Sequence, residues 1–214
     1  MNSKKHYLKK TKISTISQKT NAINSFWDWF SVNCQAFEMN MENEVLLREL
    51  DKQVSNLGDF DWEIGPGISK EYSLVVSPNG DINLLPSTKM IISSAIGSSR
   101  WEFFYAKPPK QWDLFFYFET IIGRVIEIDA KDWKYILKEI SNSLFDITVQ
   151  AVGLEKEDAT DKHAIVEIVL DGQLGEELRM TTIDNIEIVS HINDDMSKHA
   201  TNIRNLLNHV KHLK

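Results

Sequence analysis

Apolar side chains recur at helical spacing in two successive stretches that begin after residue 24. In the first, three phenylalanines between residues 26 and 37 lie on one face, and a capping-box pattern starts at Ser25. In the second, residues 42–57, five leucines and valines lie on one face and Gly58 follows as a stop signal. We therefore predict two N-terminal helices.

The segment before these helices has a different composition. Residues 1–24 are rich in Lys, Ser, Thr and Asn, and they show neither helical nor strand periodicity. Such a composition buries too little apolar surface to offset the entropy lost on ordering. We expect residues 1–24 to form a flexible basic tail.

The middle of the chain carries short strand patterns separated by turn signals and interrupted by one helical pattern at residues 87–96, with Pro86 near its start. The connections between strands are short, which favours hairpins over βαβ crossovers. We therefore predict antiparallel pairing. The expected strands are residues 62–64, 72–77, 100–107, 112–119, 125–128, 133–137 and 145–152.

The last third of the chain is aliphatic. We predict a helix at residues 161–170, with a strand as the alternative, then a turn at Asp171-Gly172 and a strand-like stretch over residues 178–189. After Asp194-Asp195, apolar residues alternate four and three apart and predict a final amphipathic helix. These residues are Met196, Ala200, Ile203, Leu207 and Val210.

Together these patterns predict an α+β fold: a mainly antiparallel sheet with two N-terminal helices, one short middle helix and C-terminal helices packed on it. A chain of 214 residues can form one large domain or two tightly packed halves, and we assign residues 25–214 to a single α+β domain. Of the 21 aromatic residues, 20 lie between Phe26 and Phe145, so we expect the aromatic core to be central.

Charge is unevenly distributed along the chain. The net charge is −7, but all 31 acidic residues lie in residues 25–195, where they outnumber the 14 basic residues by 17. An acidic body repels phosphate backbones, so we expect no nucleic acid to bind through it. It can attract a basic protein partner, although a merely solubilising surface is the simpler interpretation.

Other signals concern location. Cys34 is the single cysteine, so no intrachain disulfide can form, and such scarcity is typical of a reducing cytoplasm. Neither a secretory signal nor an apolar stretch of membrane-spanning length is found in the sequence. We expect a cytoplasmic protein that does not bind a membrane.

The motifs of catalysis and metal binding are missing from the sequence. It contains no Gly-x-Ser-x-Gly, and Cys34 is expected to pack inside the first helix. His209 and His212 could share a helix face but lack a third ligand. Asp59, Asp61 and Glu63 occupy alternate positions, so their side chains would lie on one face of a strand. Such a face can provide paired acids, a cation site or a solvated strand edge. We predict no catalytic residue, no metal and no cofactor.

Two aromatic runs, residues 101–105 and 112–118, are the most unusual local feature. We expect them to form adjacent strands joined by Lys107-Pro108-Pro109-Lys110, with one face either covered by helices or exposed for recognition. The acidic pair Glu176-Glu177 is expected in a turn. The candidate binding residues are Glu63, Trp101, Lys107, Trp112, Glu176 and Glu177.

Five segments occur in a recognisable order: Phe26-Trp27-Asp28-Trp29-Phe30, Trp62-Glu63-Ile64, residues 74–80, residues 101–109, and Leu170-Asp171-Gly172 with Leu174-Gly175-Glu176. This order covers most of residues 26–190 and resembles a bacterial family of cytoplasmic proteins with no established activity. The family often has Ala-Pro before the middle tryptophan, where this chain has Ile96-Gly97-Ser98-Ser99, so we expect that loop to differ. The resemblance implies no catalytic residue.

Three functional hypotheses follow. The first is a non-enzymatic protein-binding module of immunity type, which neutralises a partner through its acidic surface. The second is a hydrolase-like enzyme with carboxylates from distant segments, for instance Glu63 and Glu176, which would require a pocket with converging carboxylates. The third is self-assembly through Met196, Ile203 and Val210 of the last helix. A flat face of aromatic and acidic residues would favour the first.

Overall fold

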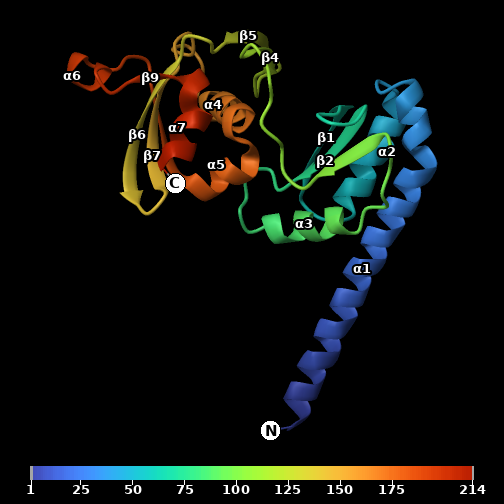
Figure 1. The fold of residues 1–214 in the computed structure, drawn as a ribbon. Coiled ribbons are helices and arrows are strands. Elements are labelled where there is room, and N and C mark those ends of the chain that lie inside the picture. The colour runs from blue at the N-terminus through green and yellow to red at the C-terminus, as the bar shows by residue number, and fades with distance from the viewer. Residues whose placement is uncertain (1, 214) are drawn as a thin grey trace. The chain divides into compact units, whose positions relative to one another are not determined.

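In the computed structural model the chain is an α+β protein, as predicted, and divides into two compact units, unit 1 (residues 1–106) and unit 2 (residues 107–214) (Figure 1). The structure describes the backbone of residues 2–213 and the side chains of residues 18–213. The single domain expected over residues 25–214 stays a prediction, because two compact units of one chain can unfold together or separately.

Unit 1 combines three helices with a three-stranded sheet. Its elements are α1 (Asn2–Met39), α2 (Glu44–Ser55), β1 (Asp61–Pro66), β2 (Tyr72–Ser77), α3 (Leu85–Ser93) and β3 (Trp101–Phe104). The Asn43 side chain caps α2 by accepting the backbone N–H groups of Val45 and Leu46, and Leu50 and Val54 of this helix are buried. The predicted second helix is therefore confirmed.

Helix α1 is longer than predicted. Its backbone is helical from Asn2, so the expected start at Ser25 is wrong. The apolar stripe that we identified begins where the helix meets the core of unit 1, and this explains why the pattern alone gave a later start. The side chains of residues 1–17 lie outside the described residues, so the expectation of a flexible basic tail stays a prediction.

The sheet of unit 1 is mixed. Strands β1 and β2 are antiparallel, with Trp62 opposite Val76, whereas β2 and β3 are parallel, with Leu74 opposite Phe103. Helix α3, which has a proline in its first turn, makes the crossover that parallel pairing requires. The preference for hairpins over βαβ units was therefore wrong for this pair of strands.

The core of unit 1 is aromatic. Phe26, Trp27 and Phe30 of α1 are nearly fully buried and pack with Trp101 and Phe103 of β3. The Phe30 ring meets the Trp101 ring edge to face at 5.1 Å, and the Trp27 and Phe103 rings meet at 4.8 Å. The aromatic face of α1 thus covers the sheet.

Unit 2 contains two sheets. Strands β4 and β5 form one antiparallel pair, and four strands in the order β8-β7-β6-β9 form the other, in which only β7 and β8 are parallel. The elements are β4 (Phe115–Glu119), β5 (Val125–Asp129), β6 (Lys134–Ser141), β7 (Leu144–Gln150), α4 (Ala159–Leu174), α5 (Glu176–Thr182), β8 (Ile183–Val189), α6 (Asp194–Ser197), β9 (Thr201–Asn202), the 3-10 helix η1 (Ile203–Asn205) and α7 (Leu206–Leu213). Because β3 belongs to unit 1 and β4 to unit 2, the two aromatic runs are not adjacent strands, and that prediction was wrong.

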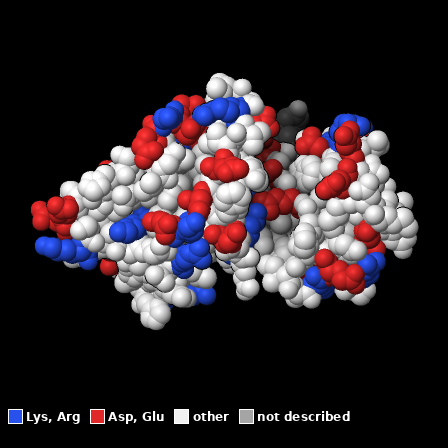
Figure 2. All heavy atoms as spheres, turned by 90° about the horizontal axis from the view of Figure 1, so that it is seen from above, with Lys and Arg blue, Asp and Glu red and all other residues white. Residues whose placement is uncertain are grey.

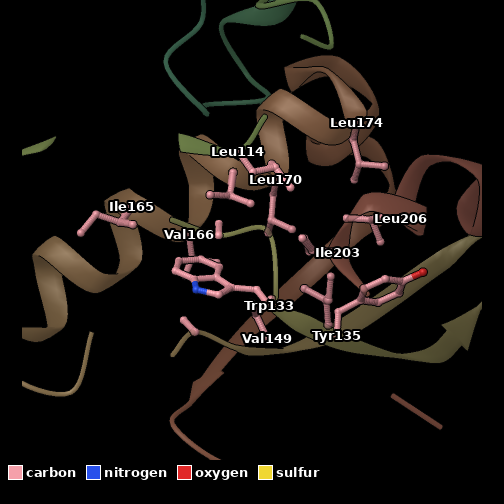
Figure 3. Packing of buried hydrophobic residues seen from close by; sticks show 14 of the residues in the cluster. Leu114, Trp133, Tyr135, Val149, Ile165, Val166, Leu170, Leu174, Ile203 and Leu206 are labelled. Carbon is pink, nitrogen blue, oxygen red and sulfur yellow. The ribbon is translucent and has the colours of Figure 1, made fainter. Parts of the chain in front are cut away.

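The core of unit 2 lies between α4 and the four-stranded sheet. Figure 3 shows Val166 and Leu170 of α4 facing Trp133, which precedes β6, and Tyr135 and Val149, which lie on the sheet. All five side chains are at most 1% exposed. The predicted helix at residues 161–170 is confirmed, and burial of its apolar residues against the sheet stabilises it.

Three local predictions in the last third were wrong. Asp171-Gly172 lies inside α4 rather than in a turn, and residues 178–182 belong to α5 before the strand β8 begins. The final helix is broken into α6, β9, η1 and α7, because β9 pairs with β6 and the Ile203 N–H donates to the Trp133 carbonyl. Ile203 and Val210 are fully buried in the core of unit 2, whereas Met196 is exposed, so the three residues do not form one exposed stripe for a second copy.

Candidate functional site

The β4–β5 sheet separates buried from exposed side chains by simple alternation. Phe116, Phe118, Ile126 and Ile128 face the core of unit 2. The other side of the sheet, which we call the outer face, is exposed. The outer face consists of Phe115, Tyr117 and Glu119 on β4 and Val125, Glu127 and Asp129 on β5.

Large apolar side chains are exposed on the outer face. Tyr117 is 64% exposed and Val125 61%. The Phe115 and Tyr117 rings meet edge to face with centroids 5.5 Å apart, so the two rings form one patch. In the turn beyond β4, Ile121 and Ile122 are also exposed. Exposed apolar side chains in such a group are typical of interaction surfaces.

Carboxylates complete the outer face. The strand register puts Tyr117 directly opposite Glu127 and Phe115 opposite Asp129. The Lys131 side chain donates to Asp129 at 2.5 Å and, together with the Lys131 backbone N–H, lowers the pKa of that carboxyl. Asp129 therefore keeps its negative charge to a lower pH than an isolated aspartate does.

The hairpin turn is fixed to the body of unit 2 despite its exposed isoleucines. The Ile121 N–H donates to Asp161 Oδ1 at 3.0 Å, and Asp161 is buried at the start of α4. Arg124 forms an ion pair with Glu157. These contacts order the turn, so a partner would lose little entropy from this hairpin on binding.

The start of unit 2 is held at the corner where α4 meets α5. The Lys107 N–H donates to Glu176 Oε2 at 2.9 Å, and the Glu176 N–H donates back to the Lys107 carbonyl at 2.8 Å. The structure thus brings together two of the predicted binding residues. Glu176 is fully buried and, like Glu177, begins α5 rather than forming a turn.

Charged side chains at this corner form ion pairs with one another. Arg179 is 7% exposed and bonds both Asp171 and, at 3.0 Å, Glu167. Burial raises the pKa of Asp171 to about 6, although Arg179 opposes this shift. Glu176 has a structural contact at this corner, because its buried carboxylate accepts the Lys107 N–H. The binding role of Lys107 and Glu176 stays a prediction.

Trp112 packs against the same corner. Its ring lies against Gly172 of α4, where an added Cβ would be 2.5 Å from Cζ2, and it contacts Phe116 at a centroid distance of 5.5 Å. The Trp112 Nε1 atom is buried and has no hydrogen-bond partner among the residues that the structure describes. Trp112 is therefore packed at the start of unit 2, and its binding role stays a prediction.

The predicted binding residues of unit 1 also differ from expectation. Trp101 is 1% exposed, and its Nε1 donates to Glu38 Oε1 at 2.8 Å, so it is a core residue. Glu63 lies on β1 opposite Val75 and is half-buried. Glu63 belongs to unit 1 and Glu176 to unit 2.

A cavity of about 350 Å³ lies in unit 1 between α1, α3 and residues 56–60. Its charged lining residues are Lys19 and Asp59. The enzyme hypothesis requires converging carboxylates, and this cavity has a single one. The described residues contain no group of three His, Cys, Asp or Glu side chains arranged to hold a metal ion.

His209 and Cys34, which the sequence raised for metal binding and for catalysis, both have contacts within the protein. The Tyr135 hydroxyl lies 2.8 Å from His209 Nδ1, and burial raises the pKa of Tyr135 to about 12. Cys34 is half-buried, and its Sγ lies 3.4 Å from the Ser31 carbonyl oxygen. Among the described residues, no helix combines the length and the hydropathy needed to cross a bilayer.

Charges on the face drawn in Figure 2 are dispersed. In Figure 2, acidic side chains lie in small groups, several with a Lys or Arg beside them, and uncharged residues separate the groups. The face shown there has no continuous acidic patch. On this face, overall acidity therefore does not by itself mark a binding surface.

Comparison with known proteins found no matching family model, no matching curated protein and no matching solved structure. The resemblance to a bacterial family of cytoplasmic proteins stays a prediction.

Proposed function

We propose that this protein is a non-enzymatic binding module that contacts another protein through the outer face of β4–β5. The observation that supports this proposal is the exposed Phe115–Tyr117 ring pair, with a carboxylate directly opposite each ring. Aromatic side chains surrounded by polar groups are typical of residues that dominate binding energy. The fixed turn adds support, because a preordered surface binds at lower entropic cost.

The proposed partner is basic. Glu119, Glu127 and Asp129 give the outer face negative charge, and residues 25–195 as a whole are acidic. Complementary charge accelerates association and rejects acidic competitors. An immunity-type role, in which the bound partner is a toxin that loses its activity, is the specific form of binding that we propose.

The burial of Glu176 makes the enzyme alternative less suitable. A carboxylate that acts on a substrate must reach it, whereas Glu176 is fully buried and accepts the Lys107 N–H. The other buried charges at the corner bond one another. These ion pairs connect α4 to α5, which fits a structural role better than a substrate site.

The test uses the full chain, affinity-purified from its own cells and analysed by native mass spectrometry at low and at moderate salt. We expect a stoichiometric basic protein partner that dissociates more readily as salt increases. Tyr117→Ser should lose the partner. The matched control is Ile140→Ser, which changes another exposed apolar residue, on β6, and should retain it.

Retention of the same partner by Tyr117→Ser, or its loss from Ile140→Ser alone, would contradict the proposed surface. The immunity-type role has its own readout. The wild-type chain should abolish the activity of the purified partner at a 1:1 ratio, and Tyr117→Ser should not. Binding without any loss of partner activity would exclude neutralisation.

A further inference from the structure

The backbone of β5 has an unpaired edge. The Ala130 N–H donates to the Leu114 carbonyl and the Thr120 N–H to the Arg124 carbonyl, which sets the alternation of bonded pairs along the hairpin. By this alternation the N–H and C=O groups of Val125, Glu127 and Asp129 point away from β4. In the part of the chain that the structure describes, this sheet has only two strands, so the edge pairs with no further strand.

The opposite edge is less open. At the start of β4, the Phe115 N–H donates to Asp113 Oδ1 at 3.3 Å. The Asp113 carbonyl accepts the Arg204 side chain at 3.3 Å. An added strand would have to displace these contacts on β4, whereas the three outward positions of β5 require no such displacement.

Side chains beside this edge form two similar receptors for a cation. Tyr117 lies opposite Glu127, and Phe115 lies opposite Asp129, so each receptor combines a ring with a carboxylate. A Lys or Arg side chain can bind a carboxylate and an aromatic face together. The receptors are two residues apart along the strand, which corresponds to about 7 Å. Side chains at alternate positions of an extended segment have the same spacing.

We propose that the partner contributes an extended segment that adds as a strand along β5 and carries Lys or Arg at alternate positions. This proposal rests on the proposed function, because it specifies how the outer face recognises its partner. The backbone of the segment bonds the edge of β5, while its basic side chains bind at the two receptors. The Tyr117–Glu127 receptor is the stronger one, since Asp129 already binds Lys131.

Charge makes a second copy of this chain a poor occupant. Antiparallel pairing of two β5 edges about Glu127 would place this carboxylate opposite its own copy, and like charges directly opposite one another destabilise a sheet. Natural sheets often protect open edges with Lys or Pro, yet β5 has neither within Val125–Asp129. A basic strand from another protein satisfies both the edge and the carboxylates.

The probe is a ten-residue fluorescent peptide in which Arg and Thr alternate, compared with the isomer Arg-Arg-Thr-Thr-Arg-Arg-Thr-Thr-Arg-Thr, in which no two arginines lie two residues apart. Fluorescence anisotropy with the full chain gives both affinities at low salt. We expect the alternating peptide to bind at least tenfold more tightly than its isomer, because only its arginines match the receptor spacing. Equal affinities would overturn the proposal, since charge alone would then explain binding.

Two substitutions at one position separate the side chain from the backbone. Glu127→Gln removes one carboxylate and should weaken the alternating peptide about fivefold, whereas Glu139→Gln, at an exposed position on β6, should leave its affinity unchanged. Glu127→Pro removes the carboxylate and also an outward N–H. An edge strand accepts proline at a position where the N–H faces away from the sheet. Glu127→Pro should abolish binding while a thermal melt shows that the chain is folded.

The outcomes distinguish this inference from the proposed function. If Glu127→Pro binds the alternating peptide as well as Glu127→Gln does, strand addition is wrong, and Tyr117→Ser with the natural partner still decides the proposed function. Self-association of the wild-type chain in sedimentation experiments, lost in Glu127→Pro, would also overturn the inference. A natural partner unaffected by Tyr117→Ser would remove the basis of both.

Discussion

Asp171 links stability to pH at the scale of a single residue. Burial raises its pKa to about 6 in the folded state, whereas an unfolded aspartate titrates near 4. Between about pH 4 and pH 6 the folded state therefore holds a proton that the unfolded state lacks. The contribution of Asp171 to stability must fall as pH rises through this window, by up to about 1.4 kcal/mol per pH unit.

The stability of the wild type must be compared with that of a variant without this carboxyl. Other carboxyls, such as Glu71 beside Arg100, have lowered pKa values, so their contribution to stability changes with pH in the opposite direction. We expect the unfolding free energy of the wild type minus that of Asp171→Asn to decrease from pH 4 to pH 6 in urea titrations. A difference that stays constant or increases over this range would contradict the assignment.

Gly172 illustrates a second effect of one residue. Alanine in a helix interior is normally favoured over glycine by about 1 kcal/mol, but here its Cβ would overlap the Trp112 ring. Gly172→Ala should destabilise the wild type and stabilise the Trp112→Ala variant. Denaturation of the four chains of this double-mutant cycle measures the coupling, and the same sign of effect in both backgrounds would refute the close contact.

At the scale of elements, the two sides of the β4–β5 sheet should respond differently to truncation. Ile128 is 3% exposed and packs into the core of unit 2, so Ile128→Ala should cost about 2–5 kcal/mol of unfolding free energy. Val125→Ala on the outer face should change it by less than about 0.5 kcal/mol. Similar costs from urea titration would mean that the outer face is covered.

Local patterns predicted elements better than pairings. The apolar spacing located α2, and the turn signals located β1 and β2, because those signals act within a few residues. The parallel pairing of β2 with β3 depends on contacts between distant segments, which periodicity does not encode. For the same reason the two aromatic runs were wrongly joined into one sheet.

The aromatic run at residues 112–118 was identified from the sequence, but its exposed side chains were not. Trp112 was the predicted binding residue of the second aromatic run, whereas the exposed rings of this run are Phe115 and Tyr117. The alternation along residues 115–119 could have identified them. Phe115 and Tyr117 lie on the same side of the strand as Glu119, and a glutamate indicates the solvent side. Glu176 and Trp101 were selected for charge and size, and their burial results from tertiary packing.

At the scale of the whole molecule, each unit has a hydrophobic core of its own. Leu50→Ala removes a fully buried side chain from unit 1 and should cost about 2–5 kcal/mol there. Hydrogen exchange followed by mass spectrometry should show faster exchange in α2 and β2 and little change in β7. Equal acceleration in both units would instead support the single domain predicted over residues 25–214.

The most direct test of the central claim is hydroxyl-radical footprinting of the wild-type chain, free and bound to the partner isolated from its own cells. Phe115 and Tyr117 are exposed aromatic side chains and therefore report on coverage of the outer face. We predict that their oxidation falls several-fold in the complex while that of the exposed Ile140 is unchanged. Unchanged oxidation of both rings, with protection elsewhere, would contradict the claim that the partner binds this face.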